Sequence, residues 1–169
     1  MSPLMSPLMV FDVESVGLHR EGFSVGDVVL VDGREVESGC FTAPLSSAAG
    51  DDEGRDWVEA NIPPTPITHE SPRPVRDAFW FRWAYWKERG AILSADCGWP
   101  VEARFLCACV DDDKSRVWSG PYPFVDISSV FIAKGMDPLA KYDRLPSELP
   151  AHNPLFDARQ SARLLWEAL

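Results

Sequence analysis

The fold is decided by the stretch from residue 9 to residue 41, which reads MVFDVESVGLHREGFSVGDVVLVDGREVESGCF. Residues 9–13 form a short, largely apolar run that predicts a strand. The part from Val25 to Phe41 predicts two more strands joined at Asp32-Gly33, because this dipeptide favours the tight turn of a hairpin. The stretch therefore predicts a first strand followed by an antiparallel hairpin.

Downstream of this stretch, helices alternate with strands. Residues 43–74 are rich in Ser, Gly, Asp and Pro, which predicts a long loop with at most a helical turn at 57–62. Apolar spacings of three and four predict a helix over 72–89, which ends at Gly90. We expect further strands at 91–95 and 124–127, a helix after Pro100, a helix or turn over 128–135, and a last helix over 157–169. The inward face of the last helix is expected to consist of Ala158, Ala162, Leu165 and Leu169. The order βββ-α-β-α-β-α predicts an α/β fold.

The length of 169 residues is that of one domain, which we expect over 9–169 after a lead-in over 1–8 that repeats MSPL. The lead-in lacks a basic segment and a continuous apolar run, so no signal peptide is predicted. No apolar run approaches the ~20 residues of a membrane-spanning helix. The four cysteines have no CxxC spacing, which predicts reduced thiols and a cytoplasmic location.

The net charge of −10 argues against broad, non-specific binding of nucleic acid, which needs Lys and Arg to neutralise phosphates. It does not exclude an enzyme that acts on nucleic acid. A carboxylate cluster that holds divalent cations is locally positive, and this local charge outweighs the sum over the chain.

Two carboxylates occur in the segment VFDVES. Asp12 and Glu14 are one residue apart on a predicted strand, and the period of two places both on the same face. Two neighbouring carboxylates are costly unless cations neutralise them, and hard oxygen ligands suit Mg²⁺ or Mn²⁺. The pair is therefore a candidate metal site.

A second acidic element occurs near the carboxyl end, where residues 152–157 read HNPLFD. Asp157 at the start of the last helix is expected to reach the first strand as a metal ligand. His152 lies in the preceding loop, and histidine exchanges protons near neutral pH, which suits a general base. The alternative is Asp157 as the N-cap of the helix and His152 as a surface residue.

Taken together, these segments resemble the DEDDh exonuclease family, which includes ribonuclease T, oligoribonuclease and bacterial proofreading exonucleases. VFDVESVGL is similar to its first motif, VVLVDGREV to its hairpin, FVDISSVF with Asp126 to its central segment, and AHNPLFDARQSARLL to its third motif. The likeness covers most of the chain in order. It implies an RNase H-like mixed β-sheet with helices on both faces.

The second motif of the family departs from the usual pattern. Family members place an Asp in the first turn of the helix after the fourth strand, whereas this chain has ADCGWPVEARFL over residues 95–106. If the family pattern is aligned on Phe105 and Leu106, its acidic ligand falls on Glu102. The residue type of the family's ligand and a position at the end of the strand favour Asp96 instead. We place Asp96 slightly ahead, with Glu102 as the alternative ligand.

The resemblance implies a 3′→5′ exonuclease that hydrolyses phosphodiesters at the 3′ end of single-stranded RNA or DNA and releases nucleoside 5′-monophosphates. It implies two divalent cations, Mg²⁺ or Mn²⁺, on Asp12, Glu14, Asp96 and Asp157, with His152 as the base. The terminal nucleotide is expected at Ser15, Val16, Gly17 and Leu18. Phe23 or Trp99 could stack on a base, although core packing is the commoner use of either. A homodimer is left open, and a catalytically weak module that binds nucleic-acid ends is the alternative function.

Overall fold

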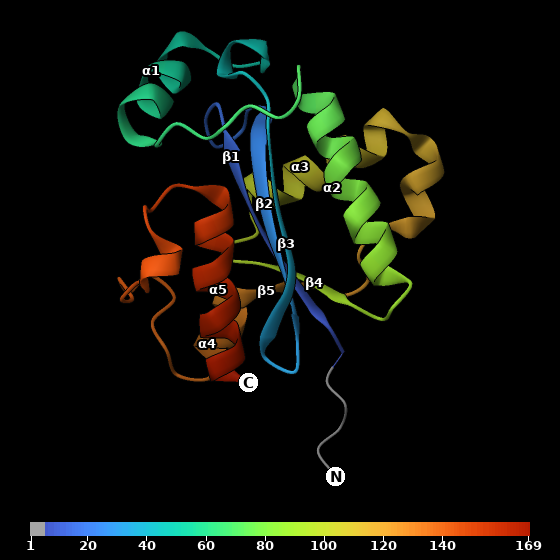
Figure 1. Cartoon of the computed structure of the whole chain (residues 1–169), viewed down its shortest axis with the longest axis vertical. Helices are drawn as coiled ribbons and strands as arrows, with labels where there is room; N and C mark the ends of the chain where they lie inside the picture. The colour runs from blue at the N-terminus through green and yellow to red at the C-terminus, as the bar shows by residue number, and fades with distance from the viewer. Residues whose placement is uncertain (1–5) are drawn as a thin grey trace.

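The computed structural model describes residues 6–169 and has a central five-stranded sheet in the order β3-β2-β1-β4-β5 (Figure 1). The strands are β1 (Leu8–Ser15), β2 (Gly22–Val31), β3 (Arg34–Thr42), β4 (Ile92–Ala95) and β5 (Phe124–Asp126). The helices are α1 (Asp52–Asn61), α2 (Pro72–Lys87), α3 (Val101–Asp112), α4 (Ile127–Ala133) and α5 (Pro154–Ala168). Three short 3₁₀ turns lie at Leu45–Ser47, Lys114–Ser119 and Pro146–Glu148.

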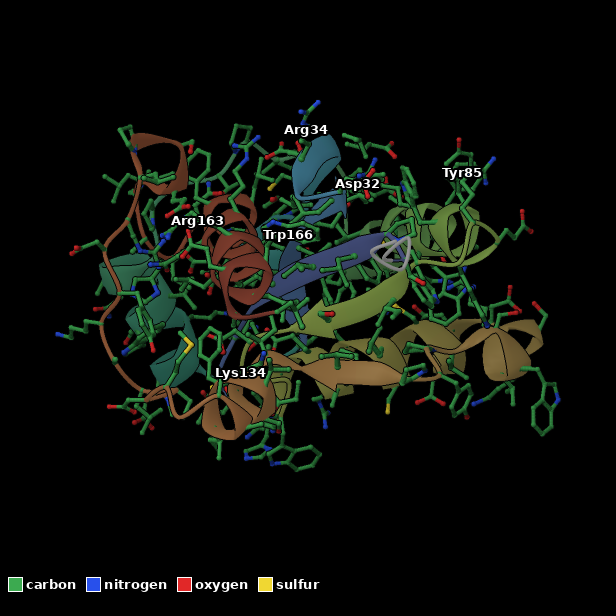
Figure 2. All side chains as sticks on the ribbon, turned by 90° about the horizontal axis from the view of Figure 1, so that it is seen from below. Asp32, Arg34, Tyr85, Lys134, Arg163 and Trp166 are labelled. Atoms are coloured by element: carbon green, nitrogen blue, oxygen red, sulfur yellow. The ribbon has the colours of Figure 1, made fainter. Side chains whose placement is uncertain are left out.

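The predicted hairpin is confirmed, with β2 and β3 joined at Asp32-Gly33. Asp32 and Gly33 have φ values of 50° and 73°, and two consecutive positive values are what a tight hairpin turn of this kind requires. Gly33 also lies against the indole of Trp166, which a Cβ at this position would meet. Figure 2 views this end of the molecule from below, with Asp32, Arg34 and Trp166 labelled.

The sheet is mixed. β1 pairs with β2 in antiparallel fashion, whereas β1, β4 and β5 run parallel to one another. The carboxyl ends of these three strands therefore meet at one edge of the sheet, where connecting segments from three parts of the chain come together.

Helices cover both faces of the sheet, with α2 and α3 on one side and α4 and α5 on the other (Figure 1). Met9, Phe11 and Val13 of β1 pack with α2 and α3, whereas Leu8 and Val10 pack with α4 and α5. This alternation confirms the predicted α/β class. By the same alternation, Asp12 and Glu14 point to the face of the sheet that α4 and α5 cover, as Leu8 and Val10 do.

The helices differ from the expectation in two places. The segment expected to hold at most a turn at 57–62 contains the ten-residue helix α1, which starts at Asp52 with Asp51 as its N-cap. The last helix begins at Pro154, three residues before Asp157, and its N-cap is Asn153. Asp157 therefore lies in the first turn and is not the N-cap.

The inward face of α5 is largely as expected. Ala158, Ala162 and Leu165 are buried, but Leu169 is exposed because the helix ends at Ala168, so its predicted inward position was wrong.

The predicted lead-in falls only partly within the structure. Residues 1–5 lie outside the described range, and Leu8 already belongs to β1, where it pairs with Leu30 and Ile92. Among residues 6–169, none of the helices combines the length and the apolar character needed to cross a bilayer.

Candidate functional site

Carboxylates from several elements converge at the edge where the parallel strands end. Asp12 and Glu14 come from the carboxyl end of β1, Glu102 from the first turn of α3, and Asp157 from the first turn of α5. Asp96 follows β4 directly. The charges of all four other carboxylates act on Asp12, which makes Asp12 the centre of the cluster.

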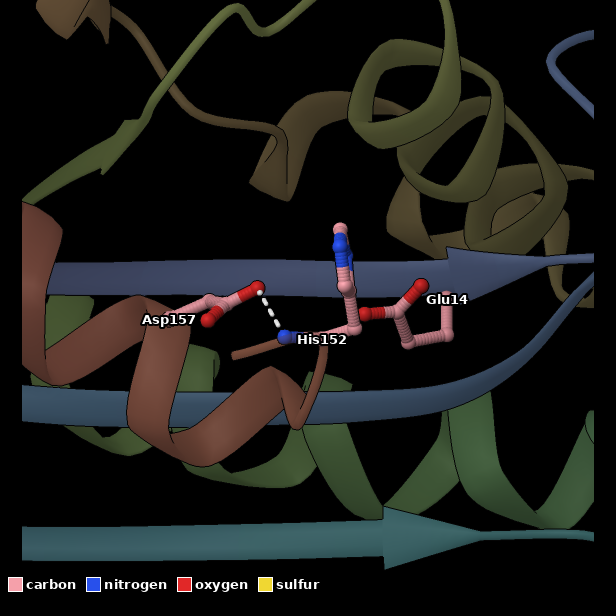
Figure 3. Close-up of side chains that lie close together, drawn as sticks. All are labelled: Glu14, His152 and Asp157. Carbon is pink, nitrogen blue, oxygen red and sulfur yellow. Dashed lines mark hydrogen bonds between the residues drawn. The ribbon is translucent and has the colours of Figure 1, made fainter. Parts of the chain in front are cut away.

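The closest grouping consists of Glu14, His152 and Asp157 (Figure 3). Each offers one ligand atom, and these atoms lie within 4.8 Å of one another. The backbone N–H of His152 donates a 3.1 Å hydrogen bond to Oδ2 of Asp157. The backbone of His152 is left-handed, with φ of 62°, so the loop turns sharply at this residue before α5 begins.

Asp157 reaches the cluster because of a glycine on the neighbouring strand. Gly26 of β2 pairs with Asp12, and a Cβ at Gly26 would collide with the backbone of Pro154 and Leu155. The absence of a side chain therefore lets the amino end of α5 lie directly on the sheet. As a result, the first turn of α5 stands beside Asp12.

An arginine also holds Asp157. Nη1 of Arg144 donates a 2.6 Å hydrogen bond to Oδ1 of Asp157 and a 2.9 Å bond to the carbonyl oxygen of Glu148. Together with the backbone N–H of His152, this arginine engages both carboxylate oxygens. A cation that binds Asp157 through Oδ1 has to share that oxygen with Arg144 or displace it.

The cluster is unfavourable for ionised carboxylates. Burial raises the pKa of Asp12 well above its usual range, and the charges of Glu102, Glu14, Asp157 and Asp96 add to the effect. Burial, followed by the charges of Asp157 and Glu102, raises the pKa of Glu14 to about 8. Such shifts are typical of sites where like charges are held together for a purpose other than stability.

The two candidates for the second motif occupy different surroundings. Glu102 is only 6% exposed and accepts a 3.3 Å hydrogen bond from the backbone N–H of Val13, and burial raises its pKa to about 7. Asp96 is less buried and accepts a 3.1 Å hydrogen bond from the hydroxyl of Ser128. Among the charges that raise the pKa of Asp12, Glu102 contributes most and Asp96 least.

The predicted substrate residues follow β1. Ser15, Gly17 and Leu18 line a cavity next to Glu14, and the Ser15 hydroxyl donates a 2.8 Å hydrogen bond to the carbonyl oxygen of Gly17. The side chain of Val16 is fully buried under α1, where it packs with Phe23. Phe23 is thus a core residue, whereas Trp99 is largely exposed and contacts His19 edge-on.

Three residues of the site carry no signal in the sequence: Gly26, Arg144 and Trp57. Gly26 and Arg144 act through contacts with α5 and Asp157, which are distant in sequence. Trp57 lies in α1, and its ring centroid is 6.3 Å from that of His152 in an edge-on arrangement. The sequence does signal the start of the helix that carries Trp57, because residues 51–54 read DDEG, an N-cap followed by acidic residues.

The chemistry of the donors fits a hard divalent cation. Half-buried carboxylates of β1 and α5 and the buried carboxylate of Glu102 in α3 repel one another in the absence of positive charge, and oxygen-rich donor sets suit Mg²⁺ and Mn²⁺. The one cationic side chain hydrogen-bonded to this cluster among residues 6–169 is Arg144, which engages Asp157 only.

No protein-family model matches the chain, and no curated protein sequence matches it. Solved structures that share its architecture include two exonucleases. One is a moderately thermophilic Exonuclease I from Methylocaldum szegediense, which is 13% identical with a TM-score of 0.66. The other is a 3′-exonuclease described for specific recognition of the 3′ end of the histone mRNA stem-loop, which is 14% identical with a TM-score of 0.52.

Both matches cover 96% of this chain, but the chain spans only 41% of the first protein and 63% of the second. At this identity the similarity concerns the arrangement of strands and helices. The chain therefore has the RNase H-like fold of these exonucleases, as the motifs in its sequence predict.

Proposed function

We propose that this chain is a cation-dependent 3′→5′ exonuclease that acts on single-stranded RNA or DNA and releases nucleoside 5′-monophosphates. The observation that carries the proposal is the convergence of Asp12, Glu14, Glu102 and Asp157, with His152 beside them, at one edge of the sheet in an exonuclease-like fold. Neither the fold nor an acidic cluster alone would be sufficient, because folds host many functions.

Asp12, Glu14 and Asp157 would hold the cations, together with Glu102 or Asp96 as the fourth carboxylate. Bound Mg²⁺ or Mn²⁺ would supply electrophilic stabilisation of the phosphate and make the attacking water more acidic. The carboxylates would keep these cations at the end of β1, next to the cavity where the terminal nucleotide is expected.

His152 would accept a proton from the attacking water at a ring nitrogen. The water oxygen forms a bond to phosphorus, and the bond between phosphorus and the 3′ oxygen of the penultimate nucleotide breaks. That oxygen takes up a proton, so the shortened strand ends in a 3′ hydroxyl and the last nucleotide leaves as its 5′-monophosphate. The hydrogen bond from the backbone of His152 to Asp157 keeps the base next to the cluster.

The test is a time course on single-stranded RNA and DNA of about 20 nucleotides, labelled at the 5′ end, with EDTA, Mg²⁺ or Mn²⁺. We expect a ladder that shortens from the 3′ end only when a cation is present, with mononucleotides as the released product. Glu14→Gln should abolish the ladder. Glu167→Gln is the matched control, because Glu167 is exposed on α5 and lies about three turns away from Asp157.

Fragments from internal cleavage would contradict an exonuclease. Binding of Mn²⁺ and of single strands without hydrolysis would instead support the alternative, a module that binds nucleic-acid ends. An absence of any Mn²⁺-dependent shift in the melting temperature would exclude both functions.

A further inference from the structure

A second cavity, of about 390 Å³, lies between α4, α5 and the connecting segment 137–144. The volume lies within the roughly 300–1,000 Å³ of small-ligand pockets. Asp96 and Arg144 both line it, and Arg144 is hydrogen-bonded to Asp157 of the carboxylate cluster. This cavity therefore adjoins the cluster on the side of α4 and α5, whereas the cavity beside Glu14 adjoins it on the side of α1.

The two cavities differ in charge. No Lys or Arg is among the described residues that line the cavity beside Glu14, and its charged groups are three carboxylates. The second cavity is lined by Lys141 and Arg144, and Asp96 is the one carboxylate among its described lining residues. A phosphate would be repelled by the first set of charges and attracted by the second.

Both cationic side chains of the second cavity have N–H donors to offer. Nη1 of Arg144 makes the two bonds to Asp157 and to the carbonyl oxygen of Glu148, whereas its Nε and Nη2 donate to none of residues 6–169. Lys141 is exposed, and its ammonium forms no ion pair or hydrogen bond within the same range. A guanidinium presents five donors in a planar fork that matches a phosphate, and an ammonium presents three.

The segment that carries these two cations is fixed against both helices. Nε2 of Gln160 donates hydrogen bonds of 3.1 and 3.4 Å to the carbonyl oxygens of Tyr142 and Asp143. Nη2 of Arg163 donates a 2.8 Å bond to the same carbonyl of Asp143. On the other side, the ring of Tyr142 packs edge-on against Phe131 of α4, with 5.7 Å between the centroids.

We infer that the second cavity holds, through Lys141 and Arg144, the phosphodiester that precedes the scissile one in the strand. The inference rests on the proposed function and names where the remainder of the substrate lies. With the terminal nucleotide beside Glu14 and the scissile phosphate at the carboxylates, the next phosphate of the strand falls beyond the cluster, where this cavity offers positive charge. The shortened strand would then leave the site over α4 and α5.

The first test locates the phosphate that the protein holds. Binding is measured for single strands that carry one neutral methylphosphonate, at the second, third or fourth linkage from the 3′ end, with Ca²⁺ in place of Mg²⁺. The neutral group at the second linkage should weaken binding most, by roughly 5- to 12-fold, between the effect of an exposed ion pair and that of a hydrogen bond to a charged group. Equal effects at all three positions would overturn the inference.

The second test connects this phosphate to Lys141. Lys141→Met should weaken binding of the unmodified strand by a similar factor, and the methylphosphonate at the second linkage should then have little further effect, because its partner is already lost. Lys134→Met is the matched control, because Lys134 (Figure 2) is exposed at the end of α4 and does not line the cavity. A methylphosphonate effect that persists in full in Lys141→Met would place the phosphate elsewhere.

The third test concerns Arg144, which also contacts Asp157. Arg144→Gln should weaken binding of the strand without weakening binding of Mn²⁺, because the guanidinium competes with a cation for Oδ1 of Asp157. Loss of Mn²⁺ affinity together with strand affinity would mean that Arg144 only positions Asp157, and would overturn its part in the inference.

A free phosphate shares the chemistry of the strand's phosphodiester, so competition experiments with inorganic phosphate and with AMP distinguish the sources. If the cavity took up free phosphate or a released mononucleotide instead, Lys141→Met would weaken binding of these competitors and leave the methylphosphonate pattern unchanged. That result would overturn the inference.

These readouts are independent of hydrolysis. A methylphosphonate pattern that depends on Lys141, in a protein that never shortens its strands, would retain the inference and reject the proposed function. Shortening of strands by a protein whose binding is insensitive to the second linkage would do the opposite.

Discussion

Gly26 pairs with Asp12 across β1 and β2, and the space beyond its Cα is filled by the backbone of Pro154 and Leu155. The contact brings the first turn of α5, and with it Asp157, to the carboxylates of β1. The lack of a side chain at Gly26 thus allows Asp157 of the last helix to join the carboxylates of the first strand in one site.

Gly26→Ala is therefore expected to push the start of α5 away from the sheet. Overpacking of this kind typically costs about 1–3 kcal/mol of stability. The affinity for Mn²⁺ and the turnover should each fall by at least about tenfold, since the ligand atoms of Asp157 and Glu14 would separate. Isothermal titration with Mn²⁺ and thermal melting measure the loss of affinity and the loss of stability.

Gly120→Ala serves as the control for this substitution. Gly120 has φ of −60°, and a Cβ there would meet its nearest neighbour at 3.8 Å, which is an ordinary contact. Normal Mn²⁺ affinity in Gly26→Ala would show that Asp157 is not needed at the cluster.

The raised pKa values predict how the cation-free protein responds to pH. The folded state binds protons at Glu14 up to a pKa of about 8, whereas the unfolded chain releases them near 4.5. Between these values the folded state carries more protons, so the free energy of unfolding falls as pH rises, by up to about 1.4 kcal/mol per pH unit for each such group. Glu102, with a pKa of about 7, acts in the same direction.

The measurement is chemical denaturation in EDTA between pH 6 and pH 8, because Asp27, with a pKa of about 6, contributes mainly below this window. The parent should lose stability across the window, and Glu14→Gln should lose less. A saturating amount of Mn²⁺ should offset the loss, since ionised carboxylates bind it better. Stability that is constant from pH 6 to pH 8 in EDTA would contradict the raised values.

Much of the fold could be predicted because its signals are local. The period of two in β1 and the Asp32-Gly33 turn are contained in a few residues, and the structure confirms both. Helix α1 was missed because only Val58 among its residues is buried, so it lacks the apolar periodicity that marks a helix. Its stability comes from the Asp51 cap and from contacts with the loop after β1.

For the site too, only the features with local signals could be predicted from the sequence. The shared face of Asp12 and Glu14 follows from strand geometry alone. The approach of Arg144 to Asp157 and of Trp57 to His152 depends on tertiary packing between segments that the sequence does not connect. The choice between Asp96 and Glu102 also depends on packing, because both lie near the end of β4.

For this pair, we predict that Glu102→Gln weakens Mn²⁺ binding and turnover more than Asp96→Asn. The sequence favours Asp96 by residue type, but Glu102 is the more buried and exerts the largest charge effect on Asp12. Both substitutions preserve size, and in Glu102→Gln the side-chain amide oxygen could still accept the hydrogen bond from Val13, so charge is the variable tested. The reverse order of effects would assign the fourth carboxylate to Asp96.

His152 provides the sharpest test of the proposed reaction, because its role is proton transfer and not cation binding. We expect His152→Asn to retain most of the Mn²⁺ affinity while turnover falls by roughly 10²–10⁴-fold, the usual contribution of a general base. Asn suits the left-handed backbone at this position, which has φ of 62°, so the loop before α5 should keep its shape. His152→Ala, which lacks this preference, should lose turnover to a similar degree and some stability as well.

The dependence of turnover on pH provides the independent check. The rate of the parent should depend on pH in a way that His152→Asn does not reproduce, because no side chain remains in the variant to accept the proton from water. Loss of Mn²⁺ affinity in proportion to turnover would make His152 a cation ligand, which its place within 4.8 Å of Glu14 and Asp157 also permits. Parental turnover in both variants would remove His152 from the reaction altogether.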